Sequence, residues 1–362
     1  MNQRISLITI AAGCCALAAC SNETATEAEA EVAQPTSETG YVVPRTPWGD
    51  PDLRGMWPIM HLISTPFQRP EEYGTRAELT EEEYAATQER LEARNERYEN
   101  EIGSNKMGMG HWAESSLRTE AARLTSLLIY PEDGRFPSLT SRGEDLRPQF
   151  ASSWSTERSD GIFDSIEDFD TWDRCVTRGM PNSMFAFNYN NGIQIHQAPG
   201  YVIIRLEMIH EARVVPVDGR PELSSDIKNW MGESRGYWEG DTLVVETTNY
   251  NGEVGMTNVG IPGSPRGDTP STVNMKTTER FEPVGPNQIN YSITVEDPEV
   301  LTSHWTARYP MIRDEEYEFF EYACHEDNSA VRNFIETSRY ERAQAAACLL
   351  YTSDAADDYF WV

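Results

Sequence analysis

The sequence has few basic side chains for its length. Its 362 residues include 30 Lys and Arg against 59 Asp and Glu, so the formal net charge is −29 at pH 7. A surface of this charge repels nucleic acid and anionic lipid headgroups. We therefore expect no nucleic-acid partner, and the acidic residues are typical of a solvated surface in a saline or periplasmic setting.

Several motifs that carry chemistry are also missing. No Gly-rich loop of the kind that holds phosphate groups leads into a helical pattern, and the G-x-S-x-G pattern of serine hydrolases does not occur. The histidines lack the close spacing of zinc ligands, although His304 and His325 can still join a carboxylate in space to hold a metal. The acidic residues 160–173 lack the ordered pattern of a calcium loop. We expect no cofactor and no metal, and a solvated acidic segment.

A long apolar run occurs at the N-terminus, over residues 5–19, and it is too short to serve as a permanent membrane span. It ends in the sequence LAAC at residues 17–20 and resembles a bacterial lipoprotein signal. The resemblance implies that residues 1–19 are removed and that Cys20 carries the lipid. It also implies a place on the periplasmic side of the envelope, at the outer membrane because Ser21 follows. An ordinary secretory signal is the alternative.

Two further segments are expected to lie outside the folded body. Residues 20–40 are mostly Glu, Ala, Thr and Ser, which bury too little apolar surface to offset their ordering entropy, so they predict a disordered tether. Residues 348–362 break abruptly from the helical text before them and resemble translated adapter read-through. About 300 residues remain between these ends, enough for one large β-rich domain or two smaller ones.

The cysteines predict one disulfide. Two of the six lie in the signal, Cys20 is the lipid site, and Cys348 falls in the excluded end. Cys175 and Cys324 remain as a pair in an oxidising compartment. Closing a loop of about 150 residues stabilises a fold by roughly 4–5 kcal/mol on the chain-entropy model, and it places the two segments side by side. Metal binding by the two thiols is the alternative.

Residues 41–170 predict an extended Pro- and Trp-rich segment followed by helices that pack on the body. Thr80 and Glu83 form a capping box that starts a helix reaching about Ile102. One narrow apolar stripe docks this helix, with a residue at every seventh position: Tyr84, Leu91 and Tyr98. A second short amphipathic stretch covers residues 115–130.

Residues 171–347 predict a β-rich ligand-binding domain. Three hairpins with a turn signal at each centre cover residues 191–208, 236–250 and 271–297. Residues 316–326 predict a further strand, and a helix from 328 to 347 ends the folded chain. Successive hairpins without β-α-β spacing favour an antiparallel meander that closes into a barrel-like or lipocalin-like body. A β-sandwich is the alternative.

Several motifs, taken as a set, resemble a family of bacterial secreted β-rich proteins. They include WGDPDLRGMW, NYNNGIQIHQAPGYVII, GYWEGDTLVVETTNY and EYACHED, and the match covers nearly all of residues 48–328. No activity is known for that family, so the resemblance implies a secreted β-rich protein and no function. Its members usually read ACHEGN where this chain has ACHEDN at residues 323–328, a departure that affects the local turn.

The most informative strand pattern runs over residues 201–215. Apolar and charged side chains alternate there, and by the same count His210 falls on the apolar face. The hairpin register pairs Ile195 with Ile204 and, carried further, pairs Tyr189 with His210. A run of this length favours a bulge, and a bulge before His210 would turn the imidazole outward.

A second apolar face ends in a carboxylate, because the residue after it in the alternation is Asp297. In a closed barrel both faces line the lumen, so we expect His210 and Asp297 at the wall of one cavity. The alternative is that Asp297 caps the turn before Pro298.

These side chains predict acid and base chemistry without a cofactor. Asp297 orients His210, which acts as base or acid. Four further side chains are expected to stabilise charge: Tyr189, Arg213, Glu279 and His325. Besides Asp297, three further candidates have a structural alternative: a satisfied His210–Tyr pair, an exposed cross-strand charge at Glu279 and a surface ion pair at Arg213.

The resulting hypothesis is a lipoprotein that binds a small, largely apolar or amphipathic molecule inside the barrel. There it would catalyse isomerisation, dehydration, elimination or hydrolysis. The alternative is a lipoprotein that binds or carries such a molecule without a reaction.

Overall fold

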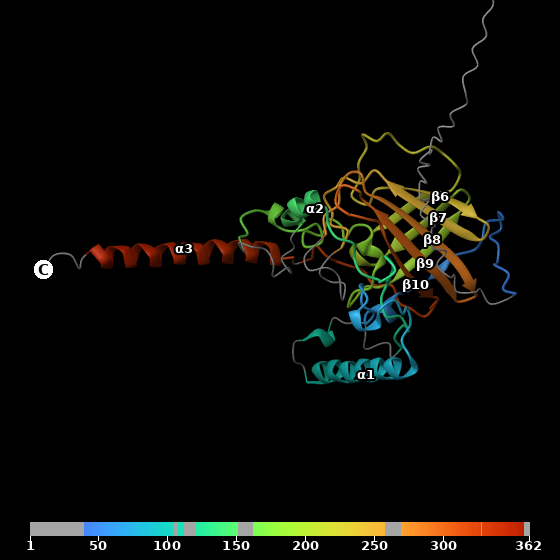
Figure 1. Cartoon of the computed structure of the whole chain (residues 1–362), viewed down its shortest axis with the longest axis horizontal. Coiled ribbons are helices and arrows are strands. Elements are labelled where there is room, and N and C mark those ends of the chain that lie inside the picture. Colours follow the sequence, from blue (N-terminus) through green and yellow to red (C-terminus); the bar gives the residue numbers. More distant parts are fainter. Residues whose placement is uncertain are drawn as a thin grey trace, which may run out of the picture. The chain divides into compact units, whose positions relative to one another are not determined.

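Two antiparallel sheets form the body of the protein in the computed structural model. The larger has six strands in the order β2-β10-β9-β8-β7-β6, and the smaller has four in the order β1-β3-β4-β5. Figure 1 shows the strands from β6 to β10 side by side. The larger sheet comprises β2 (Leu128–Tyr130), β6 (Glu233–Glu239), β7 (Thr242–Thr248), β8 (Lys276–Gly285), β9 (Gln288–Glu296) and β10 (Trp305–Ile312). The smaller comprises β1 (Gly55–Met56), β3 (Ile193–Ala198), β4 (Tyr201–Leu206) and β5 (Ala212–Pro216).

The structure describes residues 40–104, 108–111, 120–150, 162–257, 269–326 and 328–357, the last nine as backbone alone. These residues all fall in one compact unit, Ser37–Val362. The expected signal, the lipid site at Cys20 and nearly all of the tether lie outside the described residues.

The expectation of a mainly antiparallel β fold is confirmed, but the sheet does not close into a barrel. Within the described ranges no ladder joins β5 to β6 or β1 to β2, so two sheets result, in agreement with the sandwich alternative. The strands β5 and β6 nevertheless lie close together. At Gly236 on β6 there is no room for a side chain, since an added Cβ would lie 2.9 Å from the Val215 side chain on β5. Pro216 ends β5, and its ring nitrogen has no hydrogen to give to a further ladder.

The three predicted hairpins are present as β3–β4, β6–β7 and β8–β9, and Ile195 pairs with Ile204 as expected. The strand predicted at residues 316–326 is wrong, because the backbone there forms no ladder. The strand β10 replaces it earlier in the chain and contains Pro310. A proline is tolerated at this point because β2 pairs only with Thr306 and Ala307, which leaves one side of β10 unpaired at Pro310.

The core is rich in large aromatic side chains. Phe67 lies edge-on against Trp305, with 5.4 Å between ring centroids, and edge-on against Phe185 at 5.3 Å. The Tyr309 hydroxyl donates to the carbonyl of Met184, which holds the irregular segment around Phe185 against β10. All of these aromatic residues are almost completely buried, so the interior facing the larger sheet is filled by side chains.

A buried ion pair joins the two sheets. Arg213 on β5 and Glu279 on β8 are 3% and 0% exposed, with Nη1 donating to Oε1 at 2.9 Å and Nη2 donating to Oε2. The Tyr291 hydroxyl also donates to Oε1 at 2.9 Å. Burial lowers the pKa of Arg213, but the charge and hydrogen bonds of Glu279 outweigh this and raise it. The alternatives that placed Glu279 and Arg213 at the surface are therefore wrong.

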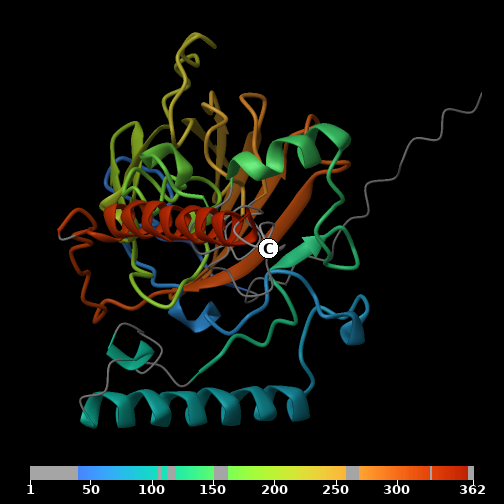
Figure 2. The same cartoon turned by 90° about the vertical axis from the view of Figure 1, so that its left-hand side faces the viewer.

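The first long helix, α1 (Glu81–Gly103), matches its prediction. Thr80 and Glu83 form the capping box. Leu91 and Tyr98 of the predicted stripe are buried, whereas Tyr84 is half-buried. The helix runs along the bottom of Figure 2. The amphipathic stretch predicted from residue 115 is not helical where the structure describes it, because Thr125 and Leu127 donate their N–H groups to the carbonyls of earlier loops. The short α2 (Ser141–Leu146) follows, and 3₁₀ turns lie at Met60–Leu62, Glu71–Tyr73, Met109–His111, Arg147–Phe150, Ile166–Asp168, Asn182–Met184 and Met208–His210.

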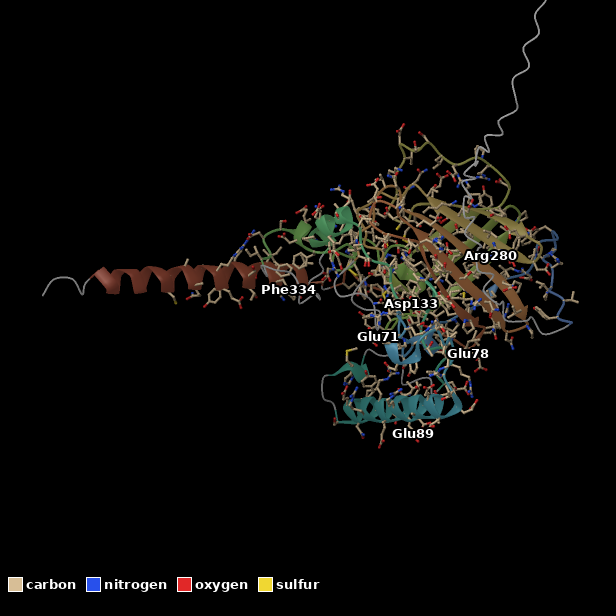
Figure 3. All side chains as sticks on the ribbon, viewed as in Figure 1. Glu71, Glu78, Glu89, Asp133, Arg280 and Phe334 are labelled. Carbon is tan, nitrogen blue, oxygen red and sulfur yellow. A yellow bond between two sulfur atoms is a disulfide. The ribbon has the colours of Figure 1, made fainter. Side chains whose placement is uncertain are left out.

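The last helix, α3 (Ala330–Asp357), begins where a helix was expected and continues beyond residue 347. Phe334, near its start (Figure 3), packs edge-on against Phe163 with 5.4 Å between centroids. Arg339 and Arg342 donate to Asp164. The interpretation of residues 348–362 as translated adapter read-through stays a prediction. None of the helices that the structure describes combines the length and apolarity of a membrane span.

We predict that Glu279→Gln lowers the free energy of unfolding by about 3–5 kcal/mol, because it leaves the Arg213 guanidinium buried without its counter-ion. Urea unfolding measures this change. The matched control is Glu239→Gln, which removes the partner of the adjacent β8 residue Arg280 (Figure 3) in an ion pair that is 42% and 48% exposed. That control is expected to cost less than about 1 kcal/mol, and equal losses in the two variants would contradict the role given to the buried pair.

Candidate binding pocket beside the disulfide

The predicted disulfide between Cys175 and Cys324 is present. The two residues are 149 positions apart in sequence, and their Cα atoms are 5.7 Å apart. The bond ties the irregular segment after β10 to the irregular segment before β3. The two segments form most of the pocket described below.

Glu207, directly after β4, fixes the segment after β10. Its carboxylate accepts hydrogen bonds from the Tyr317 hydroxyl at 2.6 Å and from the Phe320 N–H at 2.8 Å. It also accepts from Asn190 Nδ2 at 3.0 Å and from the Gly192 N–H at 2.8 Å. The side chain is completely buried, although the alternation placed it on the charged face. Four donors offset the cost of burying this carboxylate.

His210 does not lie on the apolar face, so this prediction is wrong. The strand β4 ends at Leu206, and Ile209 and His210 take positive φ angles of 59° and 47°, which turns the chain over before the imidazole. The alternative, an irregularity that points His210 outward, is the one observed, since the residue is exposed. Its Nδ1 lies 2.9 Å from the carbonyl oxygen of Tyr322 and donates to it. Tyr189 lies outside β3 and is not paired with His210; its ring stacks on Tyr322 instead, at 6.4 Å.

Asp297 is buried and caps a turn, which was its alternative interpretation. Its carboxylate accepts from the Glu299 N–H at 3.3 Å, two residues further on, which caps the turn. It also accepts from the Thr272 N–H at 2.7 Å and the Thr272 hydroxyl at 3.0 Å. Burial raises the pKa of Asp297, and the two Thr272 hydrogen bonds oppose that rise. Its partners are therefore different from those of His210. The geometry does not support the predicted orientation of the imidazole by this carboxylate.

The remaining candidate residues do not come together in one site either. Arg213 and Glu279 are engaged with each other between the sheets, as described above. His325 is exposed beside the disulfide. Of the six candidate residues, Tyr189 lines the pocket and His210 supports its wall. Among the described residues, no three side chains of metal-binding type converge.

The pocket is a cavity of about 600 Å³ between the start of α3 and the two disulfide-linked segments. Five aromatic side chains dominate its lining, and Trp172 Nε1 donates to the Tyr322 hydroxyl at 3.3 Å across it. The lining residues are Phe169, Trp172, Asp173, Tyr189, Tyr322, Cys324, Asn328, Ala330, Val331 and Phe334. A shallower hollow of about 490 Å³ adjoins it and shares Tyr189, Tyr322 and Cys324.

Charged groups lie in and behind this lining. Asp173 lines the cavity, and its N–H donates to Asp170 Oδ1 at 2.7 Å. Burial and then the Asp173 carboxylate raise the pKa of Asp170. Behind the aromatic wall, Arg178 is buried with its guanidinium carbon 5.2 Å from the Trp172 ring centre and 5.6 Å from that of Phe187. Burial lowers the pKa of Arg178 to about 10, so the side chain stays charged at neutral pH.

The sequence reasoning missed most of this pocket. It treated residues 160–173 as a solvated acidic face, whereas Phe163, Phe169 and Trp172 alternate with those acids and are the signal that the segment packs inward. Tyr322 was assigned to the strand expected at residues 316–326, and Phe334 to the helix expected at residues 328–347, so neither was recognised as a pocket residue. Strand and helix patterns in the sequence do not show which distant segments come into contact in the fold.

Comparison with protein-family models, curated proteins and solved structures finds no match to the chain. The resemblance to a secreted β-rich family therefore stays a prediction.

Glu211 gives a pH-dependent prediction. Burial raises its pKa to about 7, although the Thr177 hydroxyl donates to its carboxylate at 2.6 Å. The folded chain therefore holds this proton more tightly than the unfolded chain, whose carboxyl titrates near 4.5. Stability contributed by this site should fall as pH rises from about 4.5 to about 7.

We expect Glu211→Gln to gain stability relative to wild type between about pH 5 and about pH 8, by roughly 2 kcal/mol. Urea unfolding at both pH values measures the difference, with the exposed Glu318→Gln as control. A pH-independent difference for Glu211→Gln would show that its carboxyl is not held neutral in the folded state.

Proposed function

We propose that the protein binds a small, largely apolar molecule in the cavity between α3 and the disulfide. The observation that carries this proposal is a hollow of about 600 Å³ whose lining includes five aromatic side chains and few polar groups. Cavities of roughly 300–1,000 Å³ with this composition are the usual sites of small-molecule binding. The cavity replaces the barrel lumen expected from the sequence.

The proposal includes the location inferred from the signal. The protein would be anchored through a lipid on Cys20 and face the periplasm on a flexible tether. The disulfide supports this location, because such bonds persist in oxidising compartments. The strongly acidic composition also suits a solvated periplasmic domain.

We favour binding or carriage over cofactor-free catalysis. The ionisable side chains that line the cavity are Asp173, Tyr189 and Tyr322. Burial raises the pKa of both tyrosines, so neither phenol is a ready base. His210 donates to the backbone carbonyl of Tyr322 from outside the cavity, and its imidazole does not line the pocket. Its role in this proposal is to position the pocket wall.

Two changes in α3 test the pocket with the neutral fluorescent probe N-phenyl-1-naphthylamine. Phe334→Ala removes an aromatic wall and Val331→Trp fills the cavity, so each should weaken probe binding about tenfold or more. The control Tyr340→Ala truncates a 64% exposed ring on the same helix that does not line the cavity. The pocket assignment fails if all three variants bind the probe as wild type does.

Variants of His210 test whether its hydrogen bond positions the pocket wall. His210→Ala removes the donor to the Tyr322 carbonyl and should weaken probe binding several-fold, roughly the effect of one hydrogen bond. His210→Gln retains an N–H donor and should bind nearly as wild type. If both variants bind the probe as wild type does, His210 does not position the pocket wall. Thermal unfolding of both variants shows whether either substitution destabilises the whole protein.

A further inference from the structure

We propose that the molecule bound in this cavity is an organic cation, an amine or quaternary ammonium carried on an apolar body. The inference rests on the proposed function and adds the charge of the ligand to it. It stands on the combination of aromatic walls, a lining carboxylate and the charge of the whole chain.

The aromatic walls suit a cation. The face of an aromatic ring carries partial negative charge and attracts ammonium and guanidinium groups, most strongly for Trp and Tyr. Trp172, Tyr189 and Tyr322 supply such rings to the cavity, with Phe169 and Phe334 beside them. The chain already uses this attraction, since Arg178 lies over the rings of Trp172 and Phe187.

The lining carboxylate adds direct attraction. Asp173 is the one side chain with a formal charge in the set of described residues that lines this cavity. Asp170 lies directly behind it, held through the N–H of Asp173, and Glu321 lines the adjoining hollow. A cation beside Asp173 would relieve the repulsion between the two aspartates. With a net charge of −29, the chain also concentrates cations around itself and repels anions.

Arg178 and Arg174 carry positive charge near the cavity wall and Asp170, and both would oppose a cation. Neither lines the cavity. Arg178 lies behind the rings of Trp172 and Phe187, and Arg174 directs its Nε to the carbonyl of Asp170. Coulombic energy falls with distance, so a carboxylate in contact with the ligand outweighs a guanidinium separated from it by a ring. An anionic ligand would instead meet Asp173 directly.

Three probes of similar size but different charge test the assignment: benzyltrimethylammonium, benzyl alcohol and benzoate. Each displaces N-phenyl-1-naphthylamine from the full-length protein in a competition titration. We expect the cation to bind at least about tenfold more tightly than the other two, with an advantage that shrinks as salt is added. Asp173→Asn should weaken the cation about tenfold and leave benzyl alcohol within about twofold.

Glu239→Gln is the control, because it removes one negative charge, as Asp173→Asn does, but at an exposed position on β6. It tests the effect of the chain's net charge and should leave the affinities for all three probes unchanged. Tighter binding of benzoate than of the cation, or equal effects of Asp173→Asn on the cation and on benzyl alcohol, overturns the charge assignment alone. If the naphthylamine itself does not bind to wild type, the proposed function falls, and the charge assignment falls with it.

Discussion

The rest of the fold depends on the ion pair between Arg213 and Glu279. Because no hydrogen-bond ladder closes the two sheets within the described residues, side chains alone fix their separation and angle at this edge. A buried ion pair is stable only when its geometry is good and its remaining polar atoms are hydrogen-bonded. Here two charge-assisted hydrogen bonds run between the sheets, and the Tyr291 hydroxyl completes the carboxylate. Sliding one sheet against the other would break both Arg213–Glu279 hydrogen bonds together.

The pocket takes its position from this frame through a short chain of contacts. Arg213 holds β5, and the connection from β4 to β5 carries Glu207 and His210. These two side chains bind the backbone of the segment after β10, at Phe320 and Tyr322. The disulfide fixes the same segment from its other side. The aromatic wall is thus mounted on irregular chain that is held at several points by a rigid sheet, an arrangement common for binding loops.

Short-range sequence patterns predicted the elements that depend on neighbouring residues. The alternation and turn residues gave the three hairpins, the capping box gave the start of α1, and counting cysteines gave the disulfide. The prediction failed where the outcome depends on distant partners or on single dihedral angles. Two residues with positive φ, Ile209 and His210, reverse the facing that alternation assigns to His210. The segment containing Phe320 has the composition of a strand but gives its N–H to Glu207 rather than to a neighbouring strand.

The protein's own side chains fill the space between the two sheets, which explains why the cavity lies elsewhere. Trp305, Tyr291, Tyr309 and Phe281 fill that space here, together with the ion pair. A ligand site then requires surfaces that do not pack perfectly, and these occur where α3 and two irregular segments meet. Acidic residues can also line such a site at the edge of the body without the full cost of desolvation, whereas the interior accepts Glu279 only with Arg213 beside it.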